Sequence, residues 1–304
     1  MTVVGSYAGR TDTGRRRRRN EDAYVLAPPL FAVADGMGGA QAGEVASKLA
    51  AAALEDTDPG RLTGPERVAS LIQEANRRVH ERSSSDPSTS GMGTTMTVAL
   101  VEDEGVVIGH VGDSRAYLVR DGRIEQITED HSLVNELLKS GRLSAHEAET
   151  HPQRSVITRA VGTDPDVDVD SFTIDARDGD VFLICSDGLT DMVDDERILE
   201  TVERYGDDLD RMTKQLVSAA NRGGGEDNIT VVAFTIGRRG GVGGGDTATM
   251  EAVVIEPDDA TREDVQVPAA HATAGPPAHR VAIVLGGLIL LAIVAALVVW
   301  GLVR

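Results

Sequence analysis

Acidic residues stand where apolar segments of this sequence end in glycine-rich turns, and the clearest example is Asp35. Residues 30–34, Leu-Phe-Ala-Val-Ala, are typical of a buried strand, and Asp35 joins them to the turn Gly-Met-Gly-Gly at 36–39. An unpaired buried charge is expensive, so this carboxylate needs a compensating partner. A hard cation would serve, because glycines allow a backbone carbonyl or a ligand to come close. Taken alone, the segment fits a helix cap equally well.

The same arrangement recurs at distant points of the sequence. Asp113 and Asp187 each follow an apolar run, Asp227 lies in a glycine-rich turn before the last apolar run, and the pair Glu21-Asp22 begins another strand. If these strands end at one rim, their carboxylates converge. Convergent carboxylate and carbonyl oxygens are the ligands that Mg²⁺ or Mn²⁺ prefers, whereas no cluster of histidine and cysteine predicts zinc. Two such ions can generate a hydroxide nucleophile and bridge phosphate oxygens, which makes a protein nucleophile unnecessary.

Five consecutive arginines, residues 15–19, precede the pair Glu21-Asp22. A planar guanidinium group suits a phosphate, because it can donate two parallel hydrogen bonds. We therefore expect at least one of the five to bind phosphate. A solvated basic loop is an alternative for the run as a whole. A nuclear-localisation or nucleic-acid patch is disfavoured, because the rest of the chain is acidic.

The elements that must position these residues alternate strands and helices over residues 1–237. Asp121-Gly122 between two alternating runs predicts a hairpin, and hairpin-linked strands indicate antiparallel sheets. Residues from about 130 to 165 are polar and irregular and predict an inserted flap with two short helical pieces, 133–140 and 144–150. Outside the flap, strands are predicted at 3–8, 23–26, 30–34, 92–101, 106–111, 116–120, 123–127, 180–185 and 229–236, and helices at 40–54, 65–83, 195–205 and 209–221.

Composition limits the class of protein. The 304 residues, of which 41% are hydrophobic, suffice for one large domain or two small ones. The formal net charge of -19 argues against a general nucleic-acid binder, so we expect no nucleic-acid partner. The single cysteine, Cys185, excludes an intramolecular disulfide, and its apolar neighbours predict a buried, unreactive side chain.

Two further segments follow the predicted domain. Residues 238–280 combine glycines, prolines and acidic side chains, which predicts a disordered linker. Residues 281–303 carry no charge and are long enough to cross a bilayer as one helix. Arg280 before this span, with Arg238 and Arg239 further upstream, favours a single-pass protein of the cell membrane whose domain 1–237 is cytoplasmic.

Six short motifs, taken together and in this order and spacing, resemble the metal-dependent protein phosphatase family of the protein phosphatase 2C type. The resemblance covers about residues 1–237 and is strongest to bacterial membrane-anchored serine/threonine phosphatases. The motifs are Asn-Glu-Asp at 20–22, Ala-Asp-Gly-Met-Gly-Gly at 34–39, Gly-Met-Gly-Thr-Thr at 91–95, Gly-Asp-Ser-Arg at 112–115, Cys-Ser-Asp-Gly-Leu at 185–189 and Glu-Asp-Asn-Ile-Thr at 226–230.

The resemblance implies an α+β fold, an αββα sandwich of two antiparallel β-sheets flanked by helices. It also implies hydrolysis of phosphoserine and phosphothreonine in phosphoprotein substrates, by direct attack of a metal-bridging hydroxide. A Ser/Thr protein kinase at the same membrane is the implied opposing partner. The implied cofactors are two Mn²⁺ or Mg²⁺ ions, with a third ion in many bacterial members.

Roles of individual residues follow from the same resemblance. Asp35 would bridge the two ions, and Gly36 would offer its backbone carbonyl. Asp187 and Asp227 would bind one ion. The pair Glu21-Asp22 would contribute through the metal or through ordered water.

The third ion and the phosphate also have implied ligands. Asp113 and Asp187 match the ligands of the third ion, and Ser155 in the flap would assist. The phosphate-binding arginine of the family stands four residues before the Glu of the Glu-Asp pair, which selects Arg17. Eukaryotic members carry a proton-donating histidine where this chain has Met37, and a thioether cannot donate a proton. A metal-bound water or another acid must therefore protonate the leaving oxygen.

His110 could in principle replace the missing acid, but it lies inside a strand pattern, so we expect it to be structural.

Two other functions are weighed against the phosphatase. One is a regulator that binds phosphoproteins without hydrolysing them, and the complete set of carboxylates argues against it. The other is a metal-dependent nuclease or nucleotide hydrolase, which the acidic net charge disfavours for polymeric substrates.

Overall fold

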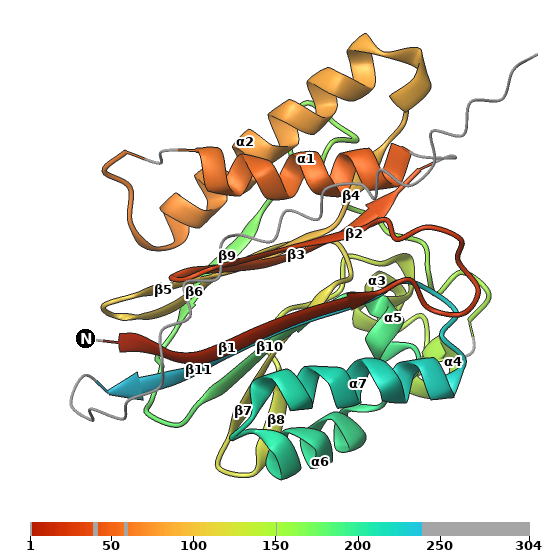
Figure 1. The fold of residues 1–304 in the computed structure, drawn as a ribbon. Coiled ribbons are helices and arrows are strands. Elements are labelled where there is room, and N and C mark those ends of the chain that lie inside the picture. Colours follow the sequence, from red (N-terminus) through yellow and green to blue (C-terminus); the bar gives the residue numbers. More distant parts are fainter. Residues whose placement is uncertain (1, 39–41, 58–59, 150, 239–304) are drawn as a thin grey trace, which may run out of the picture. The chain divides into compact units, whose positions relative to one another are not determined.

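Two β-sheets lie face to face, and helices cover the outer side of each (Figure 1). The computed structural model describes residues 2–38, 42–57, 60–149 and 151–238. The predicted linker, apart from Arg238, and the predicted membrane segment 281–303 therefore lie outside the described residues. None of the helices within the described ranges combines the length and the apolar composition needed to cross a bilayer.

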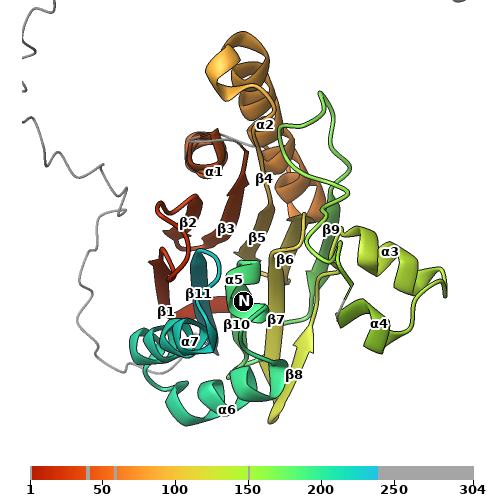
Figure 2. The same ribbon diagram turned by 90° about the vertical axis from the view of Figure 1, so that its right-hand side faces the viewer.

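The first sheet has five strands, and all of its pairs are antiparallel. Helices α6 (Asp195–Tyr205) and α7 (Leu209–Gly223) cover it, as Figures 1 and 2 show. Asp194 and Asp208 cap these helices, because each carboxylate accepts a hydrogen bond from a backbone amide of the first turn. The strand order is β1 (Thr2–Asp12), β11 (Ile229–Arg238), β10 (Val181–Cys185), β7 (Arg115–Arg120) and β8 (Arg123–Gln126).

The second sheet is also antiparallel and is covered by α1 (Ala42–Asp56) and α2 (Gly64–Ser85). The buried residues of α1 are mostly alanines, which lets this helix approach the sheet closely. The strand order is β2 (Asp22–Ala27), β3 (Leu30–Met37), β5 (Met96–Glu102), β6 (Gly105–Val111) and β9 (Asp170–Ile174), with the short β4 (Gly93–Thr94) paired to β3.

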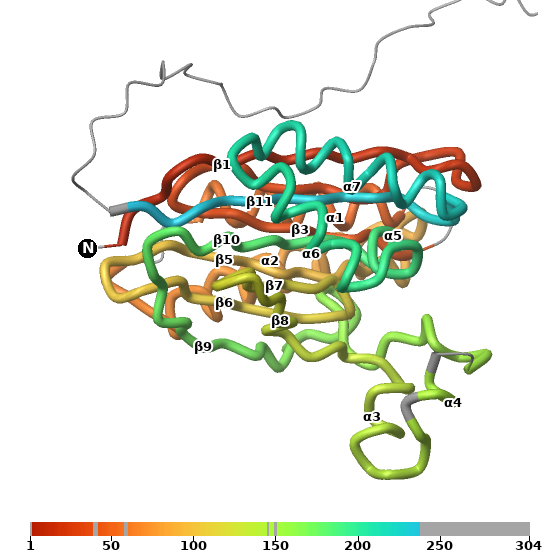
Figure 3. The backbone as a smooth tube through the Cα atoms, turned by 90° about the horizontal axis from the view of Figure 1, so that it is seen from below, coloured from red at the N-terminus to blue at the C-terminus, as the bar shows by residue number. Residues whose placement is uncertain are grey.

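The remaining helices are short. The single turn α5 (Asp187–Thr190) follows β10, and a 3-10 turn, η1 (Pro87–Thr89), follows α2. The helices α3 (Leu133–Lys139) and α4 (Ala145–Glu149) belong to the predicted flap, which projects from one end of the two sheets in Figures 2 and 3.

The arrangement of two antiparallel sheets flanked by helices confirms the fold predicted from the resemblance. The predicted hairpin is present as β7 and β8, and its turn residues Asp121 and Gly122 both have positive φ. The predicted strand 92–101 was wrong as a single element. It is interrupted at Thr95, whose amide donates to the carbonyl of Asp35 at 2.8 Å, so β4 and β5 form separately. The prediction also missed β9, a partly exposed edge strand with a largely polar sequence.

Three phenylalanines join the two sheets at the centre of the sandwich. Phe31 of β3 stacks on Phe234 of β11 at a centroid distance of 4.3 Å, and Phe182 of β10 stacks on Phe234 at 5.1 Å. All three are buried. Aromatics are only 3% of the chain, so this stack contributes a large part of the aromatic packing in the core.

Replacing Phe234 by alanine should therefore lower the free energy of unfolding by about 3–5 kcal/mol, the usual cost of a cavity left by a buried aromatic. Urea unfolding followed by circular dichroism measures this. Tyr7→Ala is the control, because Tyr7 also contacts Phe31 but is 41% exposed and should cost clearly less. Equal losses for the two variants would show that the stack does not hold the sheets together.

Candidate metal centre

Three of the predicted carboxylates lie at the same end of the first sheet. Cys185, the last residue of β10, pairs with the first residue of β7 and with the early part of β11. Asp187 follows β10, Asp113 precedes β7, and Asp227 precedes β11. The antiparallel register therefore brings together side chains that are up to 114 residues apart in sequence, from 113 to 227. This confirms that the strands carrying them end at one rim.

The second sheet delivers two more carboxylates to the same place. Asp22 of β2 lies directly opposite Asp35 of β3. Hydroxyl groups from the first sheet reach Asp22, because Ser186 Oγ donates to its Oδ2 at 2.9 Å and Thr230 Oγ1 does so at 2.6 Å. Like charges placed opposite each other on antiparallel strands repel. This rim of the sandwich thus concentrates negative charge between the sheets.

The concentration of charge changes the acidity of the carboxyl groups. Burial, and next the charges of Asp22 and Asp187, raise the pKa of Asp35 well above its ordinary value. Burial, and next the charges of Asp113 and Asp227, do the same to the pKa of Asp187. Burial is also the main cause that raises the pKa of Asp22 and of Asp113, each to about 6. Such shifts mark a site that a cation would stabilise.

The donor set fits a hard divalent cation. Within the described residues, Oδ1 of Asp22 and Oδ1 of Asp187 are buried without a hydrogen-bond partner. A buried anionic oxygen is costly unless a donor or a cation satisfies it. No three His, Cys, Asp or Glu side chains of the described part of the chain enclose a single point, so carbonyls and water would complete the shell of each ion. Oxygen donors of this kind suit Mn²⁺ or Mg²⁺.

Gly36 is required by the close packing of three chain segments. It is buried, and a Cβ atom at this position would overlap the carbonyl oxygens of Gly43 and Glu21. Met37 follows, and its Cε lies 2.8 Å from where a Cβ of Gly93 would stand. Met37 therefore packs against β4 and supplies no proton donor beside Asp35.

Arg17 is the arginine of the 15–19 run that is joined to two of these carboxylates. Its Nη2 donates to Asp227 Oδ2 at 2.6 Å, and its Nη1 lies 3.7 Å from Glu21 Oε2. Burial alone would lower the pKa of Arg17, but the charges of Asp227, Glu21 and Asp35 outweigh it and raise the pKa. The guanidinium remains 47% exposed and fully charged, so it retains donors for an anion at the rim.

Asn228 holds this arginine in place, a function that the sequence did not reveal. Its Nδ2 donates to the carbonyls of Thr13 and Arg19, at 3.0 and 2.9 Å. Its Oδ1 accepts from the amide of Glu21 at 2.8 Å, and its own amide donates to Asp227 Oδ1 at 2.7 Å. One buried side chain therefore ties both ends of the arginine segment to the carboxylates.

Hydroxyls of the motif residues fix the other acidic groups. Thr94 Oγ1 donates to the carbonyl of Asp35 at 2.8 Å, which anchors the end of β3. Ser186 and Thr230 orient Asp22, as described above. Thr94, Ser186 and Thr230 stand inside the motifs 91–95, 185–189 and 226–230. Membership of these motifs was the only sign in the sequence that they belong to the site. The site residues Glu21, Asp22, Asp35, Gly36, Asp113, Asp187 and Asp227 are brought together, and their roles as ligands stay predictions.

Ser155 is not brought into this cluster. Its side chain is exposed in the flap, and among the described residues it forms no hydrogen bond with Asp113 or Asp187. The neighbouring Arg154 instead connects the flap to the site, because its Nη2 lies 3.3 Å from Oδ2 of Asp191 in the segment after α5. The role of Ser155 in holding a third ion therefore stays a prediction without a contact to support it.

His110 and Cys185 have the structural roles expected of them. The two ring nitrogens of His110 hydrogen-bond with Thr97 Oγ1 at 2.9 Å and with the carbonyl of Glu129 at 3.0 Å. Burial, and next the adjacent His131, lower the pKa of His110 to about 4, so it is neutral at pH 7. Burial raises the pKa of the Cys185 thiol to about 12, which leaves it unreactive.

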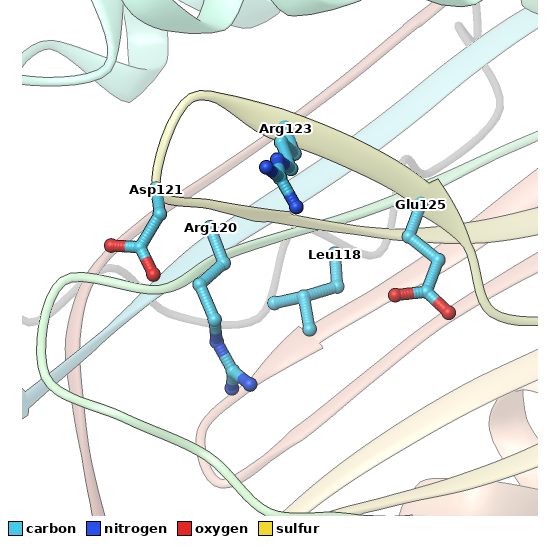
Figure 4. Close-up of a pocket in the computed structure, with 5 residues that line it drawn as sticks. All are labelled: Leu118, Arg120, Asp121, Arg123 and Glu125. Carbon is cyan, nitrogen blue, oxygen red and sulfur yellow. The ribbon is translucent and has the colours of Figure 1, made fainter.

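A cavity of about 370 Å³ lies elsewhere, at the β7–β8 hairpin (Figure 4). Leu118 is its one apolar lining residue, and the others are charged, with both signs present. None of the predicted site residues lines this cavity. It is a surface hollow of the hairpin and not part of the carboxylate rim.

Comparison with known proteins gives a family match over most of the domain. A family model described as protein phosphatase 2C matches residues 15–222. The serine/threonine protein phosphatase PstP of Mycobacterium tuberculosis is 42% identical over 238 residues, which are 78% of this chain and 46% of PstP. The chain thus spans about half the length of that relative. The serine/threonine phosphatase stp of Listeria monocytogenes is 42% identical over 234 residues, 73% of this chain and 92% of stp.

Solved structures agree with this match. The crystal structure of the Mycobacterium tuberculosis serine/threonine phosphatase PstP/Ppp has a TM-score of 0.73 at 40% identity, and covers 78% of this chain and 100% of that chain. A structure of the catalytic domain of PstP in complex with 2 manganese ions has a TM-score of 0.69 at 38% identity, and covers 78% of this chain and 100% of that chain.

Replacing Asp187 by asparagine should stabilise the metal-free protein at pH 7.5. The change removes a carboxyl group whose Oδ1 lacks a hydrogen-bond partner and whose ionisation is opposed by burial and by the charges of Asp113 and Asp227, so we expect a gain of about 1–3 kcal/mol in the free energy of unfolding. The stabilisation that Mn²⁺ gives to the wild type should be lost in the same variant. Thermal unfolding with EDTA and with Mn²⁺ measures both effects.

The control for this prediction is Asp180→Asn. Asp180 is also buried, but it is paired with Arg120 Nε at 2.7 Å, so its replacement should destabilise the protein. A loss of stability in the metal-free Asp187→Asn variant would contradict the account of the rim as an uncompensated cluster.

Replacing Asn228 by aspartate should weaken Mn²⁺ binding by about 10- to 100-fold, as for other groups that orient metal ligands. The variant loses both N–H donors and places a further negative charge beside Asp227. Isothermal titration calorimetry measures the affinity.

Asn76→Asp is a matched control for Asn228→Asp. Asn76 is buried, its Nδ2 donates to the carbonyls of Asp164 and Pro165, and its Oδ1 accepts from the amide of Gly162. Its replacement should lower stability similarly but leave the Mn²⁺ affinity unchanged. If both variants lose affinity equally, Asn228 has no special link to the site.

Proposed function

The chain belongs to the protein phosphatase 2C family, and from this premise we propose that it is a metal-dependent protein serine/threonine phosphatase. Its substrates would be phosphoproteins carrying phosphoserine or phosphothreonine. The observation that carries the proposal is the convergence of Asp35, Asp187 and Asp227 with the guanidinium of Arg17 at one rim. An anion-binding group beside a cation site is the combination that phosphoryl transfer needs.

We assign Mn²⁺ or Mg²⁺ as the cofactor. Asp35, Asp187, Asp227 and the carbonyl of Gly36 would hold two ions, and Asp113 with Asp187 a third. When bound, the ions supply a hydroxide nucleophile at neutral pH and neutralise the charge of the phosphoryl group. Asp35 and Gly36 are held in the sheet register, and Asp113, Asp187 and Asp227 each lie two residues from the end of a paired strand. This placement on the rigid sheets limits the movement of the donors.

The residues of the chain itself would bind and orient the phosphate. Arg17 engages Asp227 through Nη2 alone, so further N–H groups of its guanidinium remain for phosphate oxygens. Asn228 keeps the backbone of the arginine segment at a fixed distance from Asp227. Positioning of this kind lowers the activation free energy, because the bound substrate has already lost the translational and rotational freedom that the reaction would otherwise cost.

A location at the cell membrane is the finer part of the proposal. It rests on the uncharged segment 281–303 and on Arg280 before it, which favour a cytoplasmic catalytic domain. A Ser/Thr protein kinase at the same membrane would be the opposing enzyme. The linker 238–280 would let the domain search a local volume for shared substrates.

Hydrolysis of a phosphothreonine peptide by the purified full chain tests the function. We expect turnover with Mn²⁺, none with EDTA, and a loss of at least about 100-fold in kcat for Asp35→Asn. Asp121→Asn is the matched control, because Asp121 has φ 51° in an exposed hairpin and asparagine accepts that conformation. Peptide binding without metal-dependent turnover, or cleavage of oligonucleotides under Mn²⁺, would overturn the proposal.

A further inference from the structure

The proposed chemistry uses one arginine of the loop that joins β1 to β2, but this loop carries five, at 15–19. The loop stands beside the rim in a chain whose formal net charge is -19. Solubility in such a chain would be served by more acidic side chains, not by a block of like positive charges that repel each other. The remaining arginines therefore need an explanation of their own.

The backbone of the loop is held tightly against the site. The amides of Arg15 and Arg16 both donate to the carbonyl of Gly225, at 2.7 and 3.2 Å. Gly14 has φ 78°, and a Cβ there would overlap the carbonyl of Asp227. Together with the clamp by Asn228, these contacts fix where the arginine side chains emerge. The positive charge is thus a fixed feature of the rim, not a mobile tail.

The five side chains differ in what they contact. Arg17 is bound to Asp227, and Arg19 Nη1 lies 3.9 Å from Glu44 Oε2. Arg15, Arg16 and Arg18 are exposed, and none of the three pairs with a carboxylate within the residues that the structure describes. Of these three uncompensated positive charges, Arg16 and Arg18 directly flank Arg17, one on each side along the chain.

The flap lies across the site from this loop. In Figures 2 and 3 the β1–β2 loop and the helices α3 and α4 stand on opposite sides of α5, which begins with Asp187. A peptide whose phosphorylated residue reaches Arg17 would have this loop on one side and the flap on the other. Anionic groups on those neighbours would meet Arg16 and Arg18.

We propose that Arg16 and Arg18 form an anion-binding rim that selects phosphopeptides with further acidic or phosphorylated residues close to the target residue. The proposal rests on the phosphatase function proposed above and names its substrate class. Charges at the edge of a binding site chiefly raise the rate at which the ligand associates and make that rate depend on salt. The preference for acidic peptides should therefore appear in kcat/KM through a lower KM.

The test compares matched phosphothreonine peptides with neutral, glutamate-rich or doubly phosphorylated flanks, using the full chain and Mn²⁺. At low ionic strength we expect kcat/KM for the acidic peptides to exceed that for the neutral one by about 5-fold or more. This is the size of effect that two exposed charge interactions, each weak, give together. The double variant R16Q/R18Q should lose this preference through KM and keep its kcat on the neutral peptide. The glutamate and phosphate arms separate a general acidic requirement from recognition of a second phosphate.

The control variant is R61Q/R123Q, which removes the same charge at two exposed arginines away from the loop. It should keep the preference. Three results would overturn the proposal. The wild type could have equal kcat/KM for neutral and acidic peptides, the preference could survive in R16Q/R18Q, or it could disappear equally in the control variant. A loss of binding to anionic phosphatidylglycerol vesicles in R16Q/R18Q with unchanged peptide kinetics would also overturn it, because the loop would then serve a membrane surface.

Failure of the underlying function gives a different result. If no peptide is hydrolysed with Mn²⁺ or Mg²⁺, the proposed phosphatase activity fails, and calorimetric affinities of the same peptides still decide the inference. A tighter acidic peptide, with that difference lost in R16Q/R18Q, would support the rim. Equal affinities would refute it.

Discussion

Mutual repulsion among buried carboxylates is the constraint on which the rest of this structure depends. The register of β2 against β3 puts Asp22 opposite Asp35, and the ends of β7, β10 and β11 add further acidic side chains. Burial and neighbouring charges raise the pKa of four carboxyl groups in this cluster, those of Asp22, Asp35, Asp113 and Asp187. Selection for stability alone would not bring these acidic side chains together, so their convergence marks a functional site.

Neutral hydrogen-bonding groups hold the cluster together in the absence of charge balance. Ser186 and Thr230 donate to Asp22 across the two sheets, and Asn228 joins the turn of Asp227 to the β1–β2 loop. The phenylalanine stack of Phe31, Phe234 and Phe182 keeps the sheets at a fixed separation nearby. Packing and hydrogen bonds thus supply the rigidity, while the carboxylates supply the affinity for a cation.

Much of this could be predicted from the sequence, and the limits have physical causes. Asp35 and Asp187 were found because a charge after an apolar run is a local signal. Asn228 was missed as a clamp because the three groups that its side chain contacts, on Thr13, Arg19 and Glu21, are far away in sequence. Strand β9 was missed because a polar edge strand lacks the alternation of a buried one. Ser155 was assigned by resemblance alone; its side chain is exposed in the flap, and its role stays a prediction.

The central claim is that these carboxylates form a binding site for divalent cations, and calorimetric titration of Mn²⁺ into the metal-free protein tests it directly. The pKa values of Asp22 and Asp113 are raised to about 6, so both groups hold protons below that pH. A cation that binds there must displace these protons. We predict that Mn²⁺ binds to the wild type at pH 7.5 and that the affinity falls as the pH is lowered through about 6, with protons released on binding. Absence of binding at pH 7.5, or an affinity that does not change between pH 7.5 and 5.5, would contradict the account.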